Sequence, residues 1–278
     1  MKILVDIFGG FGNQLFQIGL ALHLKKKNYN PMLYTFSSKK SIGHNVFFID
    51  EKYFGLGKLS ESEEKKIGKI KSYSYLNKKL FQIIGEDNIS SIKNGDWVKD
   101  IKSNFSTISF NGFWQDRMFV DENIEDIKKG LLQFDSFENA IDKQKKKGST
   151  VIHVRRGDHQ QYLPFQYYLD SISKASQMIS NFHYEIITDD YEWVKSKKEF
   201  TYAEKIHFPN KSDNVMENTI KNFSKMIEFE NFIISNSTYS WWAARLGQNE
   251  NSNIYYPWPY WEGKNLDLFY EKWTKVNR

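Results

Sequence analysis

Two adjacent arginines, Arg155 and Arg156, directly follow an apolar run, residues 150–154, that is typical of a buried strand. Arginine is always protonated and presents a planar fork of N–H donors that fits phosphate oxygens. A pair of arginines at the point where a strand passes into a loop can therefore hold a nucleotide diphosphate without a metal ion. An exposed basic turn is the simpler interpretation of any isolated Arg-Arg pair, so the hypothesis depends on other segments of the chain.

Two further segments carry residues suited to binding an anion. Residues 9–14 read Gly-Gly-Phe-Gly-Asn-Gln and residues 236–244 read Asn-Ser-Thr-Tyr-Ser-Trp-Trp-Ala-Ala, and each joins an apolar strand pattern to a helical one. Glycines let the backbone approach a ligand closely, and the amides at a helix N-terminus attract an anion. Leu15 replaces the third glycine of a dinucleotide fingerprint, which argues against NAD or FAD. Asn13 could equally be a helix cap.

The second of these segments places hydroxyl groups at a predicted helix start. Ser237, Thr238 and Ser240 lie where unpaired backbone amides are also expected, and together these groups would form an anion site. Helix capping is the alternative role, and one helix end can do both. The tryptophans that follow, Trp241 and Trp242, are predicted to pack in the core rather than to stack against a sugar.

Other catalytic and metal-binding patterns are absent from the sequence. No Asp-x-Asp motif occurs, which argues against a diphosphate site bridged by a metal. The 6 His residues show no spacing typical of metal ligands, and no order of Ser, His and Asp suggests a nucleophilic triad. We therefore predict neither a metal nor a cofactor.

The composition is that of a globular protein. The chain has 278 residues, of which 40% are hydrophobic, enough to bury the core of one large domain or two modest ones. The aromatic share of 17% suits sugar-stacking surfaces as well as aromatic cores. The net charge of +5 is modest, and lysine runs at residues 25–27 and 145–147 are typical of solvated surfaces, so we predict no nucleic-acid partner. An anionic small substrate or a membrane surface would also suit these charges.

The sequence also bears on location. It contains 0 Cys, so disulfides and thiolate metal sites are excluded. Residues 3–5 are apolar but continue through Asp6 into the glycines, which predicts a first strand rather than a signal peptide. No apolar run approaches the ~20 residues that a membrane span requires. We expect a cytoplasmic protein, with peripheral association with the inner face of the membrane as an open alternative.

Short apolar runs separated by helix-length spacers predict parallel sheets wrapped by helices. The predicted strands are residues 3–7, 107–110, 150–154, 184–188, 206–208, 232–235 and 254–256. Helical patterning is visible near residues 60–71 and over residues 121–144, whereas most of the region between residues 36 and 110 gives mixed signals. The polar residues 145–148, which end in glycine, predict a linker.

These elements predict an α/β fold with two Rossmann-like domains in series. We place the N-terminal, acceptor-side domain at residues 1–147 and the C-terminal, donor-binding domain at residues 148–260. Residues 261–278 have helical spacing and predict a C-terminal helix that crosses back to the first domain.

Five motifs in a fixed order resemble glycosyltransferase family 11, the α-1,2-fucosyltransferases, and more distantly the α-1,6- and protein O-fucosyltransferases that share the H-x-R-R-x-D signature. These motifs span nearly the whole chain and comprise residues 10–14, 112–115, 153–158, 187–190 and 237–244. The resemblance implies a GT-B architecture with two Rossmann-like domains facing a central cleft. It also implies GDP-L-fucose as the donor, inversion at the anomeric carbon and no metal requirement.

The resemblance assigns roles to individual residues. Arg155 would hold the β-phosphate, and Asn13 would reach the same phosphate from the N-terminal domain. The full set of implied substrate-binding residues is Gly12, Asn13, Gln14, His153, Arg156, Asp189, Asn222, Ser237, Thr238 and Ser240. The acceptor hydroxyl requires a general base, and the candidates among acidic residues near the motifs are Asp158 and Asp116.

Three positions depart from the family pattern. Phe11 and His159 stand where the family usually has Leu and Tyr, and both changes are tolerable. Asn222 stands where the family commonly has an Asp that would accept from the N1 and N2 donors of guanine. The carbonyl of Asn can accept only one of these bonds, so either guanine selectivity is weaker or another acid, such as Glu217, replaces it.

The sequence as a whole thus predicts an inverting, metal-independent fucosyltransferase that forms Fuc-α-1,2-Gal in O-antigen or oligosaccharide synthesis. Its partners would be GDP-L-fucose and a galactose-terminated oligosaccharide or lipid-linked glycan. Two alternatives stay open: a related GT-B enzyme with another nucleotide sugar or linkage, which Asn222 favours, and a non-catalytic sugar-binding module, which the aromatic content suits.

Overall fold

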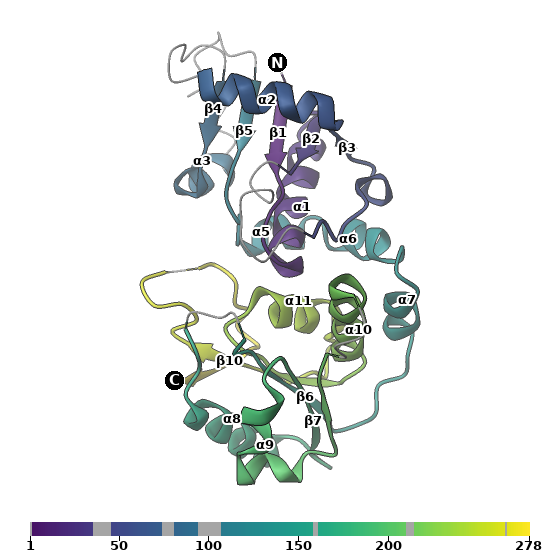
Figure 1. The fold of residues 1–278 in the computed structure, drawn as a ribbon. Helices are drawn as coiled ribbons and strands as arrows, with labels where there is room; N and C mark the ends of the chain where they lie inside the picture. The colour runs from purple at the N-terminus through teal and green to yellow at the C-terminus, as the bar shows by residue number, and fades with distance from the viewer. Residues whose placement is uncertain are drawn as a thin grey trace. The chain divides into compact units, whose positions relative to one another are not determined.

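The computed structural model describes residues 2–35, 46–73, 81–93, 107–157, 161–209, 214–264 and 266–278. The chain divides into two compact units, Met1–Gly130 and Leu131–Arg278 (Figure 1). In the described part of the chain, each unit is built around one sheet whose strands all pair in parallel. The α/β class predicted from the sequence is confirmed.

The first unit has the strand order β3-β2-β1-β5-β4. Its strands are β1 (Lys2–Asp6), β2 (Pro31–Tyr34), β3 (Gly57–Lys58), β4 (Phe81–Ile84) and β5 (Thr107–Phe110). Its helices include α1 (Phe11–Lys26), α2 (Glu61–Tyr73), α3 (Ile89–Lys93) and α5 (Arg117–Asp121), and α6 (Ile124–Leu131) reaches the end of the unit. The connections of β1 run to β2 on one side, and β5 pairs with β1 on the other, so a topological switch point lies between β1 and β5.

Helix α1 forms the centre of the first core. Its residues from Phe11 to Leu24 are almost all buried, since apolar side chains lie all around the helix and not on one face alone. Gly19 allows a close approach of α5, because a Cβ atom there would lie 3.1 Å from the carbonyl oxygen of Phe119. Of the helices in the described ranges, none is long and apolar enough to cross a membrane.

The second unit has the strand order β11-β10-β9-β6-β7-β8. Its strands are β6 (Ser149–Val154), β7 (His183–Thr188), β8 (Lys205–His207), β9 (Asn231–Ile233), β10 (Ile254–Trp258) and β11 (Thr274–Asn277). Its helices include α7 (Asp135–Ile141), α8 (Phe165–Met178), α9 (Tyr191–Lys195), α10 (Val215–Ile227) and α11 (Thr238–Gly247). This order is typical of a Rossmann fold, in which ligands bind at the switch point outside the carboxyl ends of the strands. Here the switch point lies between β6 and β9.

The boundary between the units lies at Gly130 and Leu131, earlier than the predicted boundary at residue 147. Helix α7 belongs to the second unit because it packs against α10, where the rings of Phe137 and Phe223 stack with centroids 6.5 Å apart. The predicted linker, residues 145–148, lies inside this unit, and the amide of Gly148 donates to Glu230 Oε2 at 2.7 Å. The linker prediction was wrong because polar residues and a glycine also suit a turn that starts a strand.

The predicted C-terminal helix was also wrong. Within residues 266–278 the described regular element is the strand β11, which pairs in parallel with β10. The apolar residues that suggested a helix pack instead on α11: Trp241 Nε1 donates to the carbonyl oxygen of Leu268 at 3.0 Å, and the rings of Trp241 and Trp273 lie 6.0 Å apart. The segment therefore completes the second sheet.

Candidate functional site

The arginine motif and the hydroxyl-rich motif meet at the switch point of the second sheet. His153 is the fifth residue of β6, and its Nδ1 lies 2.9 Å from the Oγ atom of Ser235, which follows β9. His153 and Ser235 are both buried, so this hydrogen bond holds the ends of two strands together rather than facing solvent. The loops that continue from these strands, with Arg155 on one and Ser237 on the other, therefore begin side by side.

The N-terminus of α11 faces this edge of the sheet. Ser237 is the N-cap residue, and its side chain makes no capping hydrogen bond to the helix. Ser240 is buried, with its Oγ atom 3.2 Å from the carbonyl oxygen of Ser237, so its hydroxyl stabilises the first turn of the helix. Ser237 and Thr238 are partly exposed and, with the amides of the first turn, suit the anion site predicted here.

Arg155 lies close to the first turn of α11. Burial raises the pKa of Tyr239 in that turn far above its ordinary value, and the positive charge of Arg155 acts in the opposite direction. The Tyr239 hydroxyl stays protonated and donates to the carbonyl oxygen of Thr219 at 2.5 Å. The guanidinium group and the positive end of the α11 dipole thus act on the same region.

Arg156 has different surroundings from Arg155. Its guanidinium carbon lies 4.5 Å from the ring centre of Tyr162 and 4.1 Å from that of Trp193, and its Nε donates to Asp190 Oδ2 at 3.3 Å. Two aromatic faces and a carboxylate hold this side chain at the surface of the second unit. These contacts stabilise the loop, and the role of Arg156 as a phosphate ligand stays a prediction.

Asn222 lies on α10, about two turns from its start at Val215, and is partly exposed. Glu217, the acid suggested as its replacement, is five positions earlier, which places it roughly 140° around the helix axis from Asn222. The backbone amide of Glu217 donates to Asn214 Oδ1 at 2.7 Å, in the cap of the helix. Glu217 and Asn222 thus project in different directions and are poorly placed to exchange roles.

Asn236 lies in the hydroxyl-rich motif, residues 236–244, but was not among the predicted site residues. It is the third residue after β9 and is fully buried, and its Nδ2 donates to the carbonyl oxygen of Gln161 at 2.8 Å. Its Oδ1 is buried and has no hydrogen-bond partner. Its position shortly after a predicted strand could have indicated that it belongs to the site, because the residues that follow parallel strands lie at the same edge of the sheet.

In the first unit, the two N-terminal motifs also meet at a switch point. Gln17 joins them, since its Oε1 accepts from the amide of Phe8 at 3.0 Å and its Nε2 donates to the carbonyl oxygen of Gly112 at 3.0 Å. Gln115 Nε2 donates to Asn13 Oδ1 at 3.1 Å. Asn13 is therefore not the helix cap, a position that Gly10 occupies, and its amide lies in a partly exposed polar cluster.

Gln14 has a structural role in this unit. Its Nε2 donates to the carbonyl oxygens of Gly9 and Val46 at 2.9 and 2.8 Å, and its Oε1 accepts from the amide of Phe48 at 3.1 Å. Gln14 and Gly12 are both buried. These two residues shape the loop before α1, whereas Asn13 between them is the partly exposed member of the predicted set.

The turn after β5 is held by one carboxylate. Glu86 Oε1 accepts from the amides of both Phe113 and Trp114, the second at 3.0 Å. Trp114 is fully buried with a φ angle of 56°, a conformation that a bulky residue rarely adopts. The hydrogen bonds to Glu86 and the burial of the indole stabilise this conformation and thereby orient Gln115.

Of the two candidate bases, Asp116 is bonded to other parts of the first unit. It is buried, accepts from the amide of Met118 at 2.9 Å as the N-cap of α5, and forms an ion pair of 2.6 Å with Lys93. A carboxylate held in this way suits a structural role better than proton transfer. Asp158 lies outside the described residues.

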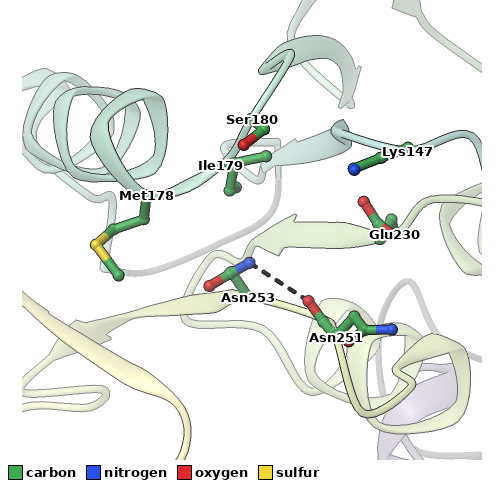
Figure 2. Close-up of a pocket in the computed structure, with 7 residues that line it drawn as sticks. All are labelled: Lys147, Met178, Ile179, Ser180, Glu230, Asn251 and Asn253. Carbon is green, nitrogen blue, oxygen red and sulfur yellow. Dashed lines mark hydrogen bonds between the residues drawn. The ribbon is translucent and has the colours of Figure 1, made fainter.

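A cavity lies at the opposite edge of the second sheet, where its strands begin. Its volume is about 450 Å³, and Figure 2 shows polar residues around it, with Asn253 Nδ2 donating to the carbonyl oxygen of Asn251 at 3.4 Å. Lys147, Glu230 and Asn253 precede β6, β9 and β10, so they lie at the amino ends of the strands. Among the described residues, no cluster of three or more His, Asp or Glu side chains could hold a metal ion.

A match to a protein family identifies the enzyme class of the chain. A model of glycosyl transferase family 11 matches residues 94–276, well over half of the chain. The chain belongs to glycosyl transferase family 11. It is thus a glycosyltransferase, and the resemblance found in the sequence motifs is confirmed.

Two curated relatives come from Escherichia coli. An alpha-1,2-colitosyltransferase is 25% identical over 190 residues, which cover 62% of this chain and 63% of the relative, less than two thirds of its length. The O-antigen biosynthesis glycosyltransferase WbnK is 23% identical over 304 residues, with 96% of this chain and 98% of the relative covered.

Two solved structures share the fold. A mutant of FUT1 from Arabidopsis thaliana in complex with GDP has a TM-score of 0.52 and 13% identity, covering 92% of this chain and 70% of the other. The NodZ alpha-1,6-fucosyltransferase soaked with GDP-fucose has a TM-score of 0.51 and 11% identity, covering 88% of this chain and 92% of the other. The predicted GT-B architecture of two Rossmann-like units is confirmed.

The surroundings of Asp116 generate a first prediction. Asp116→Asn keeps a side-chain oxygen for the helix cap but removes the charge that pairs with Lys93, so we expect a loss of about 1–3 kcal/mol in the free energy of unfolding. Sugar transfer at a temperature where the variant is folded should stay within about threefold of the wild type. Urea unfolding and steady-state kinetics measure both. A large loss of kcat at unchanged stability would restore Asp116 as the base.

Proposed function

We propose that this glycosyltransferase transfers L-fucose from GDP-L-fucose to a hydroxyl group of a galactoside, with inversion and without a metal, and forms Fuc-α-1,2-Gal. The observation that carries the proposal is the pairing of β6 with β9, which brings the loop of Arg155 and the N-terminus of α11 together at the switch point of the second sheet. A diphosphate leaving group suits this combination of a guanidinium group, helix amides and hydroxyls. The relatives support the fucosyl class: a fucosyltransferase soaked with GDP-fucose and a GDP complex of FUT1 share the fold.

The proposed reaction is a single displacement. The acceptor oxygen attacks the anomeric carbon on the face opposite GDP, the bond from that carbon to the β-phosphate oxygen breaks, and the electron pair leaves with GDP. The acceptor proton passes to a general base, for which Asp158 is the remaining candidate. Charge develops on the β-phosphate, and a preorganised donor that stabilises such charge contributes ~10²–10³ in rate.

The acceptor would be a galactose-terminated oligosaccharide or a lipid-linked glycan. WbnK, of which 98% is covered by the match to this chain, is named for O-antigen biosynthesis. This name supports a role in building a surface polysaccharide. A cytoplasmic site of action, at the inner face of the membrane, would give access to a lipid-linked acceptor. Incubation of GDP-fucose with a panel of β-galactosides, followed by NMR of the product linkage, tests the donor, acceptor and linkage together.

A second candidate is transfer of colitose instead of fucose. The alpha-1,2-colitosyltransferase among the relatives is 25% identical to this chain. Colitose differs from fucose by lacking the 3-hydroxyl group, so the two donors share GDP and the leaving-group chemistry. Competition between GDP-fucose and GDP-colitose for the same acceptor, compared as kcat/KM, distinguishes the two candidates.

A sugar-binding module without catalysis would not be stabilised by GDP in a thermal-shift assay.

Arg155→Lys should abolish most of the transfer while the fold persists. A lysine places a point charge where a planar fork is required to bind phosphate oxygens, so the loss should occur mainly in kcat. Steady-state kinetics with GDP-fucose, together with circular dichroism as a control for folding, measure the effect. Retention of more than about half of the wild-type kcat/KM would remove Arg155 from the site.

Transfer should survive removal of divalent metals. In the proposed mechanism the charge of the diphosphate is balanced by Arg155 and the α11 amides, so dialysis against EDTA should leave the rate within about twofold. The assay is repeated with added Mg²⁺ and Mn²⁺. Complete loss of activity in EDTA that either metal restores would contradict the metal-independent mechanism.

Asn222→Asp should strengthen GDP binding by about 1 kcal/mol, because hydrogen bonds to a charged acceptor are stronger than neutral ones. ADP binding should not improve, because adenine lacks the N1 and N2 donors of guanine. Calorimetry of both nucleotides against wild type and variant provides the comparison, with Glu217→Gln as a matched change on the other side of α10. Equal changes for GDP and ADP, or none for either, would show that Asn222 does not read the base.

A further inference from the structure

The loop that carries Arg155 is bonded to the carboxylate of Asp189 at three points. Asp189 follows β7, and it accepts hydrogen bonds from the amide of Arg156 at 2.7 Å, from the amide of Gly157 at 3.0 Å and from Nη1 of Arg155. The last residues of β6 and β7 are paired in register, Val154 opposite Thr188, so the residues that follow them emerge side by side. The contact is thus a direct result of the parallel pairing.

The two oxygens of Asp189 fix both the backbone and the side chain of the loop. Oδ1 accepts from one amide, and Oδ2 accepts from the second amide and from the guanidinium group. Its side chain is 19% exposed and that of Arg155 is 29% exposed, so both lie partly shielded from water, where charged hydrogen bonds are strong. A guanidinium group has five N–H donors, so a bond from Nη1 is compatible with bonds from its other nitrogens to a phosphate.

We propose that Asp189 is a positioning residue that sets the direction of the Arg155 guanidinium toward the diphosphate of the donor, and that it does not bind the substrate itself. A carboxylate repels a phosphate, and both of its oxygens are engaged by the loop. This inference rests on the proposed function for the identity of the ligand, and it replaces the substrate-binding role that the family resemblance implied for Asp189. Its physical basis is the preorganisation of a charged donor before the substrate binds.

The neighbouring acid has a separate role. Asp190 Oδ1 accepts from the amide of Trp193 at 3.0 Å as the N-cap of α9, and its Oδ2 accepts from Nε of Arg156 at 3.3 Å. Asp190 therefore stabilises the packed arginine, whereas Asp189 is bonded to the arginine proposed to meet the phosphate. Each of the two arginine side chains thus donates to a different acid, Arg155 to Asp189 and Arg156 to Asp190.

Asp189→Asn tests the role. The amide group of Asn places a donor against one of the three donors of the loop, so we expect the Arg155 loop to shift and kcat to fall about 10²-fold, the scale of loss that a misplacement of about 1 Å can cause. GDP affinity should fall about tenfold, the scale of one charged hydrogen bond. Glu192→Gln, an exposed residue on α9, removes the same charge and should leave both values within about twofold.

A second variant perturbs Asp189 without changing a charge. A Cβ atom at Gly157 would lie 3.0 Å from Asp189 Oδ2, so Gly157→Ala should displace the carboxylate slightly and lower kcat several-fold. Gly157 lies in an exposed loop, which keeps the test valid even where Asp189→Asn fails to fold. Wild-type kcat and GDP affinity in Gly157→Ala and in a folded Asp189→Asn would overturn the proposal.

A double-mutant cycle with Arg155→Lys separates positioning from a general structural role. If Asp189 acts through Arg155, adding Asp189→Asn to Arg155→Lys should cost less than about twofold more in kcat. Additive losses would overturn the proposal, because they would mean that Asp189 acts independently. GDP calorimetry needs no sugar transfer. A wild type whose GDP affinity falls in Asp189→Asn and Arg155→Lys, but which transfers no fucose, would therefore contradict the proposed donor sugar alone.

Discussion

The parallel pairing of β6 with β7 on one side and β9 on the other is the constraint on which the second unit depends. Because all three strands run in the same direction, each delivers its following residues to the same edge of the sheet. Three segments far apart in the sequence thereby meet: the arginine loop, the Asp189-Asp190 pair and the start of α11. The buried bond between His153 and Ser235 reinforces this meeting from inside the core.

Residue type alone does not decide which polar groups at this edge serve chemistry. Arg156 has the same side chain as Arg155, yet Tyr162 and Trp193 enclose its guanidinium group. Ser240 has the same hydroxyl as Ser237, yet its Oγ atom is buried against the backbone of the same helix turn. The edge thus combines groups that hold the architecture with a smaller number that are placed to meet a ligand.

In the first unit, side chains that follow or face the strand ends likewise hold the loops, and most of them are neutral amides. Amide side chains, above all Gln14 and Gln17, satisfy the backbone of the loops around the β1 and β5 strand ends, while Glu86 fixes the turn that follows β5. Since buried polar groups require partners, these side chains hydrogen-bond to the loop backbone and stabilise its conformation. Asn13 and Gln115 bond to each other at the partly exposed end of this network.

The sequence alone was sufficient for the α/β class, the family and the strands with continuous apolar runs, because a strand buried on both faces requires such a run whatever surrounds it. It did not predict β2, which is only four residues long and begins with a proline, or β11, in which Val276 is the buried residue. With one buried position, β11 leaves no apolar pattern, and the proline that opens β2 is a residue that is depleted in strands. The aromatic spacing near Trp273 predicted a helix because helical spacing and packing against a neighbouring helix can produce the same order of residues.

The motifs chosen from the sequence lie at strand ends and helix starts, which leave local signals in glycines, arginines and hydroxyl residues. Only the tertiary structure decided which residues of each motif bond to groups from distant parts of the chain. Asp116 and Gln14 carry suitable groups, but Lys93 in one case and Val46 and Phe48 in the other occupy them from distant parts of the chain. Such partners are set by the pairing of strands and the packing of helices, and a local stretch of sequence holds no record of which distant group will lie within hydrogen-bond reach.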